Sequence, residues 1–163
     1  MGWTYAKFLL AHERSGIAGV ARSKKALERI KQIASAEMSY GEPLIQDPAF
    51  KSKIANAELE LNSLEYTELR TLAKDSAGKG PGPESSLLKI KGTDIQQMVT
   101  ELAMEAVGYY ANPHLVTTLS NEYVGPDYAT NISGSYFNFR KASIYGGSNE
   151  IQRNIIAKMV LGL

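Results

Sequence analysis

The feature of this sequence that most constrains its fold is the spacing of its apolar residues, which recur every three or four positions over long stretches. Between Thr4 and about Ser35, this spacing puts the apolar side chains on one side of a helix and the charged ones on the other. The apolar positions are Tyr5, Phe8, Leu9, Ile17, Val20, Leu27, Ile30 and Ile33. We therefore predict one long amphipathic helix in this stretch.

Two more long helices are expected in the middle of the chain. Asp47–Pro48 provides a capping side chain followed by proline in the first turn, and the helix that it starts runs to about Lys74. The segment 76–86 (SAGKGPGPESS) is rich in glycine, proline and serine, and predicts an exposed loop. Leu87–Val107 then predicts a third helix, which ends at Gly108.

The last third of the chain predicts two shorter helical segments. Residues 108 to about 126 contain proline and glycine and indicate a longer connection. Tyr128–Ser143 is predicted to be helical, and Ser148 follows Gly146 and Gly147 as the N-cap of a final short helix. Because few stretches alternate with a period of two, we predict an all-α fold in one domain, an up-down four-helix bundle with an additional C-terminal helix.

The composition narrows the classes of function. The 18 basic and 17 acidic residues nearly cancel, so no net field draws the chain to nucleic acid or to an anionic membrane. The absence of cysteine excludes disulfides, thiolate metal sites and a cysteine nucleophile. His12 and His114 have no cluster of ligands around them, so we expect no metal site. We find no signal peptide and no apolar segment long enough to span a membrane, and expect a cytoplasmic protein.

The segment Ile144 to Leu163, IYGGSNEIQRNIIAKMVLGL, resembles the terminal signature of acyl-CoA dehydrogenases. Two glycines let the backbone approach a planar ring, and a helix start offers unpaired N–H groups to polar ligand atoms. Residues 2–19, GWTYAKFLLAHERSGIAG, resemble the first helix of the C-terminal domain of the family, in which a Glu-Arg or Thr-Arg pair meets the acyl thioester. The resemblance covers essentially the whole chain and implies a C-terminal helical domain from a longer protein.

The resemblance also implies where the catalytic base is. In most members of the family, the base is the glutamate after the aromatic residue of the terminal signature, and Gly146 occupies that position here. In isovaleryl- and long-chain-type members, the base comes instead from the first helix, where this sequence has Glu13. We therefore expect Glu13 to be the base, and an ordinary solvated carboxylate paired with a lysine or arginine is the alternative.

The resemblance implies that the complete protein oxidises an acyl-CoA thioester between its α- and β-carbons with FAD as cofactor. It implies substrate contacts from His12, Arg14 and Gly147, and FAD contacts from Ser148, Asn149 and Glu150. An electron-transfer flavoprotein would accept the electrons, and the protein would form a dimer, a tetramer or a heteromer. In the family, amino-terminal helical and central β domains close the pocket, so we expect the isolated chain to be inactive.

Two elements of the family are weak in this sequence. The Arg-x-x-Phe-Gly element brings an arginine to the flavin of the neighbouring subunit, and it is reduced here to Tyr40-Gly41 with Glu37 in place of the arginine. The Gln-x-x-Gly-Gly element survives at best as Met104 with Val107-Gly108. These departures leave two alternatives open: a non-catalytic assembly or partner subunit of a heteromeric dehydrogenase, and a flavin-dependent oxidase or oxygenase on the same fold.

Overall fold

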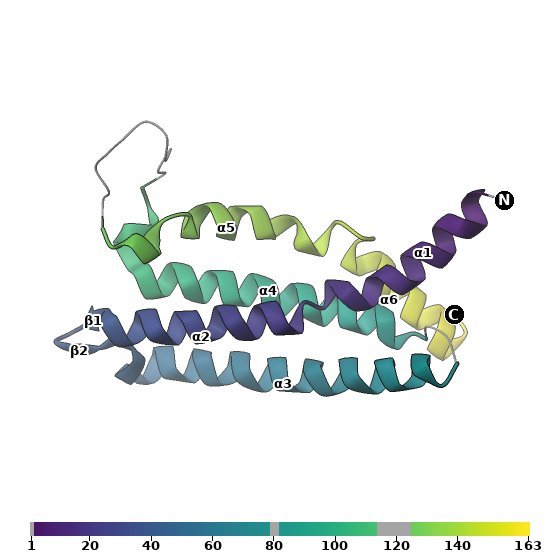
Figure 1. Ribbon diagram of the computed structural model, residues 1–163, viewed down its shortest axis with the longest axis horizontal. Coiled ribbons are helices and arrows are strands. Elements are labelled where there is room, and N and C mark those ends of the chain that lie inside the picture. Colours follow the sequence, from purple (N-terminus) through teal and green to yellow (C-terminus); the bar gives the residue numbers. More distant parts are fainter. Residues whose placement is uncertain (1, 79–81, 114–124) are drawn as a thin grey trace.

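The computed structural model in Figure 1 describes residues 2–78, 82–113 and 125–163, and only the backbone at residues 7, 10–15 and 17. The α-helices of this part are α1 (Gly2–Ile17), α2 (Val20–Ala36), α3 (Pro48–Ser76), α4 (Glu84–Val107), α5 (Ile132–Phe139) and α6 (Asn149–Ile156). A hairpin of two-residue strands, β1 (Met38–Ser39) and β2 (Glu42–Pro43), joins α2 to α3. None of the described helices is long and apolar enough to cross a bilayer.

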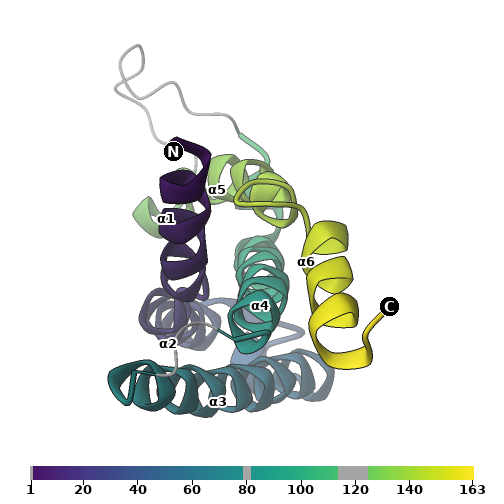
Figure 2. The same ribbon diagram turned by 90° about the vertical axis from the view of Figure 1, so that its right-hand side faces the viewer.

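Helices α2, α3, α4 and α5 run up and down beside one another, and α6 is appended, so the predicted bundle is confirmed (Figure 1). Figure 2, viewed from one end, shows α4 in the middle, in contact with the other α-helices. The core is built from the apolar faces of α2, α3 and α4, and includes Leu27, Ile30, Phe50, Leu61, Leu88, Ile95, Val99 and Leu102. Burial of these faces is the main source of stability for helices of this kind.

The predicted start of α3 is confirmed, because an Asp47 side-chain oxygen accepts a hydrogen bond from the Phe50 backbone N–H at 2.8 Å, and Pro48 opens the helix. The predicted helix over Tyr128–Ser143 is shorter in the structure. Asn131 has φ 65° just before α5, and the last turn, Arg140–Ser143, is a 3-10 turn. A left-handed residue cannot continue a right-handed helix, so this helix cannot begin earlier.

The prediction of one helix over Thr4–Ser35 is wrong at Ala18 and Gly19, where α1 ends and α2 begins. Gly19 has φ 61° and ψ 31°, in the left-handed region that glycine adopts without strain. Ala18 is fully buried against α4, and a Cβ added at Gly92 would lie only 2.5 Å from its Cα. The side-chain nitrogen of Gln96 donates to the Ala18 carbonyl oxygen at 3.3 Å. This close contact with α4 accompanies the break in the helix.

The amino-terminal part of α1 extends beyond the bundle (Figure 1). Its large apolar side chains are mostly exposed: Trp3, Tyr5, Phe8 and Leu9. A cluster of exposed, large apolar side chains is typical of a surface that contacts another protein or another domain.

Candidate functional site

The glycine turn, Gly146 and Gly147, lies between the 3-10 turn and α6, and both residues have positive φ angles, 68° and 83°. The side chain of Gln152 is fully buried, and its nitrogen donates to the carbonyl oxygens of both glycines at 3.3 Å. Ser86 of α4 donates to the other end of the same amide at 2.8 Å. A Cβ at Gly147 would lie 2.7 Å from the Gln152 nitrogen, so a side chain there would displace this bond. The turn is therefore held by α4 through Gln152.

A buried lysine holds both sides of the glycine turn. The ammonium group of Lys89 donates to the side-chain oxygen of Asn149 at 2.7 Å and to the carbonyl oxygen of Ser143 at 3.2 Å. Lys89 has no exposed surface, and burial lowers its pKa because it removes water from the charged form, while Glu150 and Asp94 act in the opposite direction. A buried cation is costly unless its donors are satisfied, so this arrangement ties the turn firmly to α4.

The remaining groups of Asn149 are also used inside the chain. The hydroxyl of Thr93 lies 3.3 Å from the Asn149 side-chain oxygen, and the Asn149 nitrogen donates to Asp94 at 3.4 Å. Asn149 is almost completely buried. Its side chain therefore faces α4 and is not free to contact a ligand.

Glu150 is exposed at the start of α6. The N–H of its own backbone, and then the hydroxyl of Ser148, hold the pKa of the Glu150 carboxyl below its usual value. Ser148 makes no side-chain capping bond to the helix backbone. The start of α6 thus presents an ionised carboxylate and a hydroxyl beside the exposed backbone of the glycine turn.

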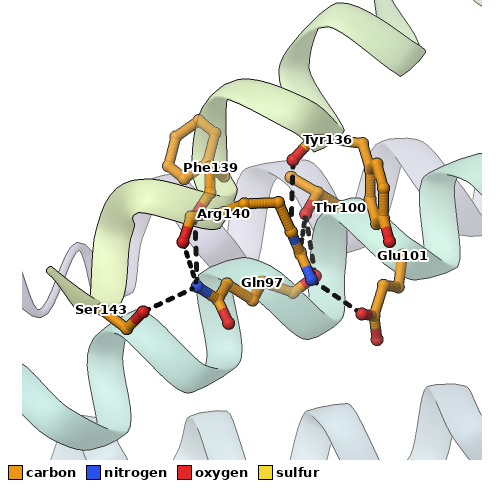
Figure 3. A network of polar contacts seen from close by, with 7 residues as sticks. All are labelled: Gln97, Thr100, Glu101, Tyr136, Phe139, Arg140 and Ser143. Carbon is orange, nitrogen blue, oxygen red and sulfur yellow. Dashed lines mark hydrogen bonds and ion pairs between the residues drawn. The ribbon is translucent and has the colours of Figure 1, made fainter. Parts of the chain in front are cut away.

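Arg140 fixes the 3-10 turn that precedes the glycine turn (Figure 3). Its guanidinium donates to the Glu101 carboxylate at 2.8 Å, to the Gln97 carbonyl at 2.9 Å and to the Thr100 hydroxyl at 3.0 Å. The same group lies over the Tyr136 ring, 4.3 Å from its centre. The Gln97 side chain donates back to the Arg140 carbonyl at 3.2 Å, so this arginine is committed to internal contacts with α4.

The carboxylate of Glu37, in the weak Arg-x-x-Phe-Gly element, is hydrogen-bonded to another residue of the chain. Glu37, at the end of α2, accepts a hydrogen bond from the Tyr128 hydroxyl at 2.7 Å. This bond, together with burial, raises the pKa of Tyr128 to about 12. Tyr40 lies fully exposed at the tip of the hairpin, with φ 52°. The end of α2 therefore presents a negative, internally bonded group.

The predicted site residues fall into two groups in the structure. Gly147, Ser148 and Glu150 lie together at the start of α6, with Asn149 turned toward α4. His12, Glu13 and Arg14 lie on α1, but their side chains are outside the described part, as is the whole of His114. The roles assigned to all of these residues stay predictions.

Sequence analysis missed Lys89, Gln152 and Ser86, which position the glycine turn. One signal was present, because polar residues at 86, 89 and 93 recur at helical spacing along α4. Such a stripe indicates a buried polar contact when a neighbouring helix covers it, and the sequence does not show which helix does so.

We expect Lys89→Met to loosen the glycine turn. Losing a hydrogen bond from a charged donor weakens a segment by about 1.5–3 kcal/mol, so amide hydrogen exchange over residues 143–150 should speed up at least about tenfold. Lys91→Met is the matched control, because Lys91 lies two positions away and bonds Glu60 of α3 on the exposed side at 2.9 Å. Equal exchange rates in the two variants would show that Lys89 does not hold this turn.

Comparison with known proteins places these features in a family context. Residues 1–161 match the model described as "Acyl-CoA dehydrogenase, C-terminal domain". The chain is 29% identical over 164 residues to acyl-CoA dehydrogenase IpdE1 of Mycobacterium tuberculosis, an alignment that covers 99% of the chain and 38% of that relative. The chain therefore spans about two fifths of the length of this relative.

Two solved structures share the fold. One is the ChsE4-ChsE5 complex from Mycobacterium tuberculosis, with a TM-score of 0.78, 24% identity, and coverage of 100% of this chain and 41% of that one. The other is butyryl-CoA dehydrogenase from Megasphaera elsdenii, with a TM-score of 0.77, 20% identity, and coverage of 98% and 39%.

Proposed function

Because this chain belongs to the acyl-CoA dehydrogenase family and corresponds to the C-terminal domain of its members, we propose that the complete protein is an FAD-dependent acyl-CoA dehydrogenase. The match to the family over residues 1–161 carries the proposal. The reaction would remove a proton from the α-carbon of an acyl-CoA thioester and a hydride from its β-carbon, which leaves a trans-2-enoyl product. FAD, when bound, supplies the acceptor for the hydride.

The start of α6 fits one edge of a flavin. The exposed glycine turn has no side chain to block a planar ring, and the first N–H groups of a helix favour polar ligand atoms. We assign flavin contacts to Ser148, Asn149 and Glu150. Because the Asn149 side chain bonds Lys89, its contact would come from the backbone N–H. The Glu150 carboxylate, ionised at neutral pH, would accept a hydrogen bond.

We assign the base to Glu13 and the thioester contacts to His12, Arg14 and Gly147. Gly146 cannot take a proton, so the carboxylate must come from another element. Ala18, directly after α1, packs on Gly92, while α6 packs on Ser86, Lys89 and Thr93.

Both elements thus meet α4 within residues 86–96, about 15 Å of helix. This shared support favours a site to which α1 and the glycine turn both contribute. Burial of such a site under other domains would desolvate the carboxylate and make it a stronger base. The exposed apolar side chains of α1 are consistent with a surface that another domain covers.

We propose that an electron-transfer flavoprotein takes up the electrons and that the protein is a homo-oligomer. One observation favours a second candidate, a partner subunit of a heteromeric dehydrogenase. Glu37 stands where the family has a flavin-binding arginine, and its carboxylate is bonded to Tyr128 and would repel a phosphate. The structurally similar ChsE4-ChsE5 assembly is a complex of two different proteins.

The test is to purify the longer protein and mix it, without oxygen, with a panel of acyl-CoA thioesters differing in chain length, branching and rings. We expect a yellow protein whose flavin absorbance is bleached by at least one thioester, and turnover with an artificial electron acceptor. The isolated 163-residue chain serves as the inactive control. A colourless longer protein that binds no flavin would support the partner-subunit candidate instead, and rapid reoxidation by oxygen would indicate an oxidase.

A further inference from the structure

A cavity of about 310 Å³ lies between α2, α4 and α5, away from the glycine turn. The space opens to solvent, and Arg22, Arg29 and Ser135 of its lining are exposed. Small side chains line it on all three helices: Ser23 and Ala26 on α2, Ala103 on α4, and Ser135 on α5. Larger residues at these positions would close the space.

The wall of the cavity is mainly apolar. Its described apolar lining consists of Ala26, Ile30, Ile33, Val99, Ala103, Ile132 and Phe139. Known small-molecule pockets span about 300–1,000 Å³ and combine apolar walls with a few polar groups. This cavity is at the lower end of that range, so it suits a short acyl chain or a single ring better than a large cofactor.

Two arginines give the cavity its charge. Arg22 and Arg29 line it from α2, seven residues apart, which is two helical turns or about 10 Å. Both are exposed, and neither forms an ion pair or hydrogen bond with another described residue. The described lining residues include no carboxylate. Two other described arginines do have acidic partners, since Arg140 pairs with Glu101 and Arg153 with Glu150.

We propose that this cavity is a binding site for a small amphipathic anion, whose apolar part occupies the space between the helices and whose carboxylate or phosphate is held by Arg22 and Arg29. Guanidinium groups bind such anions through paired, charge-assisted hydrogen bonds. Two cations that have no acidic partner among the described residues, beside an apolar space, match the two ends of such a ligand. The site shares no residue with the proposed flavin and thioester contacts, so it stands independently of the proposed function.

The test is titration of the 163-residue chain with octanoate, octyl phosphate and 1-octanol, by calorimetry and by amide chemical shifts. We expect saturable binding of an anionic probe, with shifts at residues 22–33, 96–103 and 130–139. Tighter binding of octyl phosphate would assign a phosphate head group, and tighter binding of octanoate a carboxylate. Either supports the site, whereas equal binding of 1-octanol and both anions would overturn the role of the arginines.

Two kinds of variant test separately the charge of the arginines and the volume of the cavity. Arg22→Gln with Arg29→Gln should weaken anion binding at least about tenfold, because both charge-assisted contacts are lost. Lys25→Gln with Lys51→Gln is the control, since it removes the same charge from exposed positions outside the lining, and it should change affinity less than about twofold.

Ala103→Phe should fill the cavity and abolish binding without loss of helix signal in circular dichroism. Ser135→Phe, at an exposed position of the opposite wall, is the second filling variant if Ala103→Phe lowers helix content. Absence of saturable binding of either anion up to about millimolar concentration would overturn the proposal, as would binding that none of these variants changes.

Discussion

Replacing Glu13 with glutamine in the longer protein should lower the turnover rate at least about a hundredfold, while thioester binding stays close to that of the unaltered protein. Glutamine keeps the size and hydrogen-bonding reach of glutamate but cannot accept the α-proton. The loss should therefore appear in the rate of flavin reduction, measured by stopped-flow absorbance, and not in the thioester dissociation constant. Glu28→Gln is the matched control, because Glu28 is an exposed carboxylate on α2 that pairs with Lys31 at 2.7 Å.

A rescue experiment tests whether carboxylates at positions 13 and 146 would both reach the α-carbon of the substrate. Gly146→Glu in the Glu13→Gln background restores a carboxylate at the position that most members of the family use. Gly146 has φ 68°, so a side chain there costs about 1–2 kcal/mol of backbone strain, and we expect rescue to be partial. Near-normal flavin reduction in Glu13→Gln alone would place the base elsewhere and contradict the assignment.

Gly92→Ala should destabilise the chain by about 1–3 kcal/mol, although alanine is the better helix former. The added methyl group would lie 2.5 Å from the Ala18 Cα and 2.8 Å from its carbonyl oxygen, both backbone atoms that cannot rotate away. Relief requires that the corner between α1 and α2 move away from α4. Urea unfolding of the isolated chain, followed by circular dichroism, measures the change in the free energy of unfolding.

Gly134→Ala is the matched control for this prediction. Gly134 lies within α5, and a Cβ built there meets nothing within 4 Å. The same substitution should therefore stabilise the chain by about 0.5–1 kcal/mol through helix propensity alone. If both variants were stabilised equally, the close contact between α4 and the Ala18 backbone would not exist in solution.

The sequence by itself determined the class of fold and the place of the glycine turn. Helical spacing predicted the bundle, and the cap at Asp47 and Pro48 located the start of α3, because such signals act within a few residues along the chain. The terminal signature likewise located the turn at Gly146 and Gly147 without any knowledge of packing.

Only the tertiary structure decided how these parts are held. The break at Ala18 was hidden because α1 and α2 both keep an apolar face, and the backbone contact with Gly92 joins residues far apart in sequence. The burial of Lys89 and the inward orientation of Asn149 depend on which helix covers them. Whether a polar side chain meets solvent, a ligand or another helix is set by contacts across the fold, and the spacing of residues along one helix carries no information about the side chains that face it.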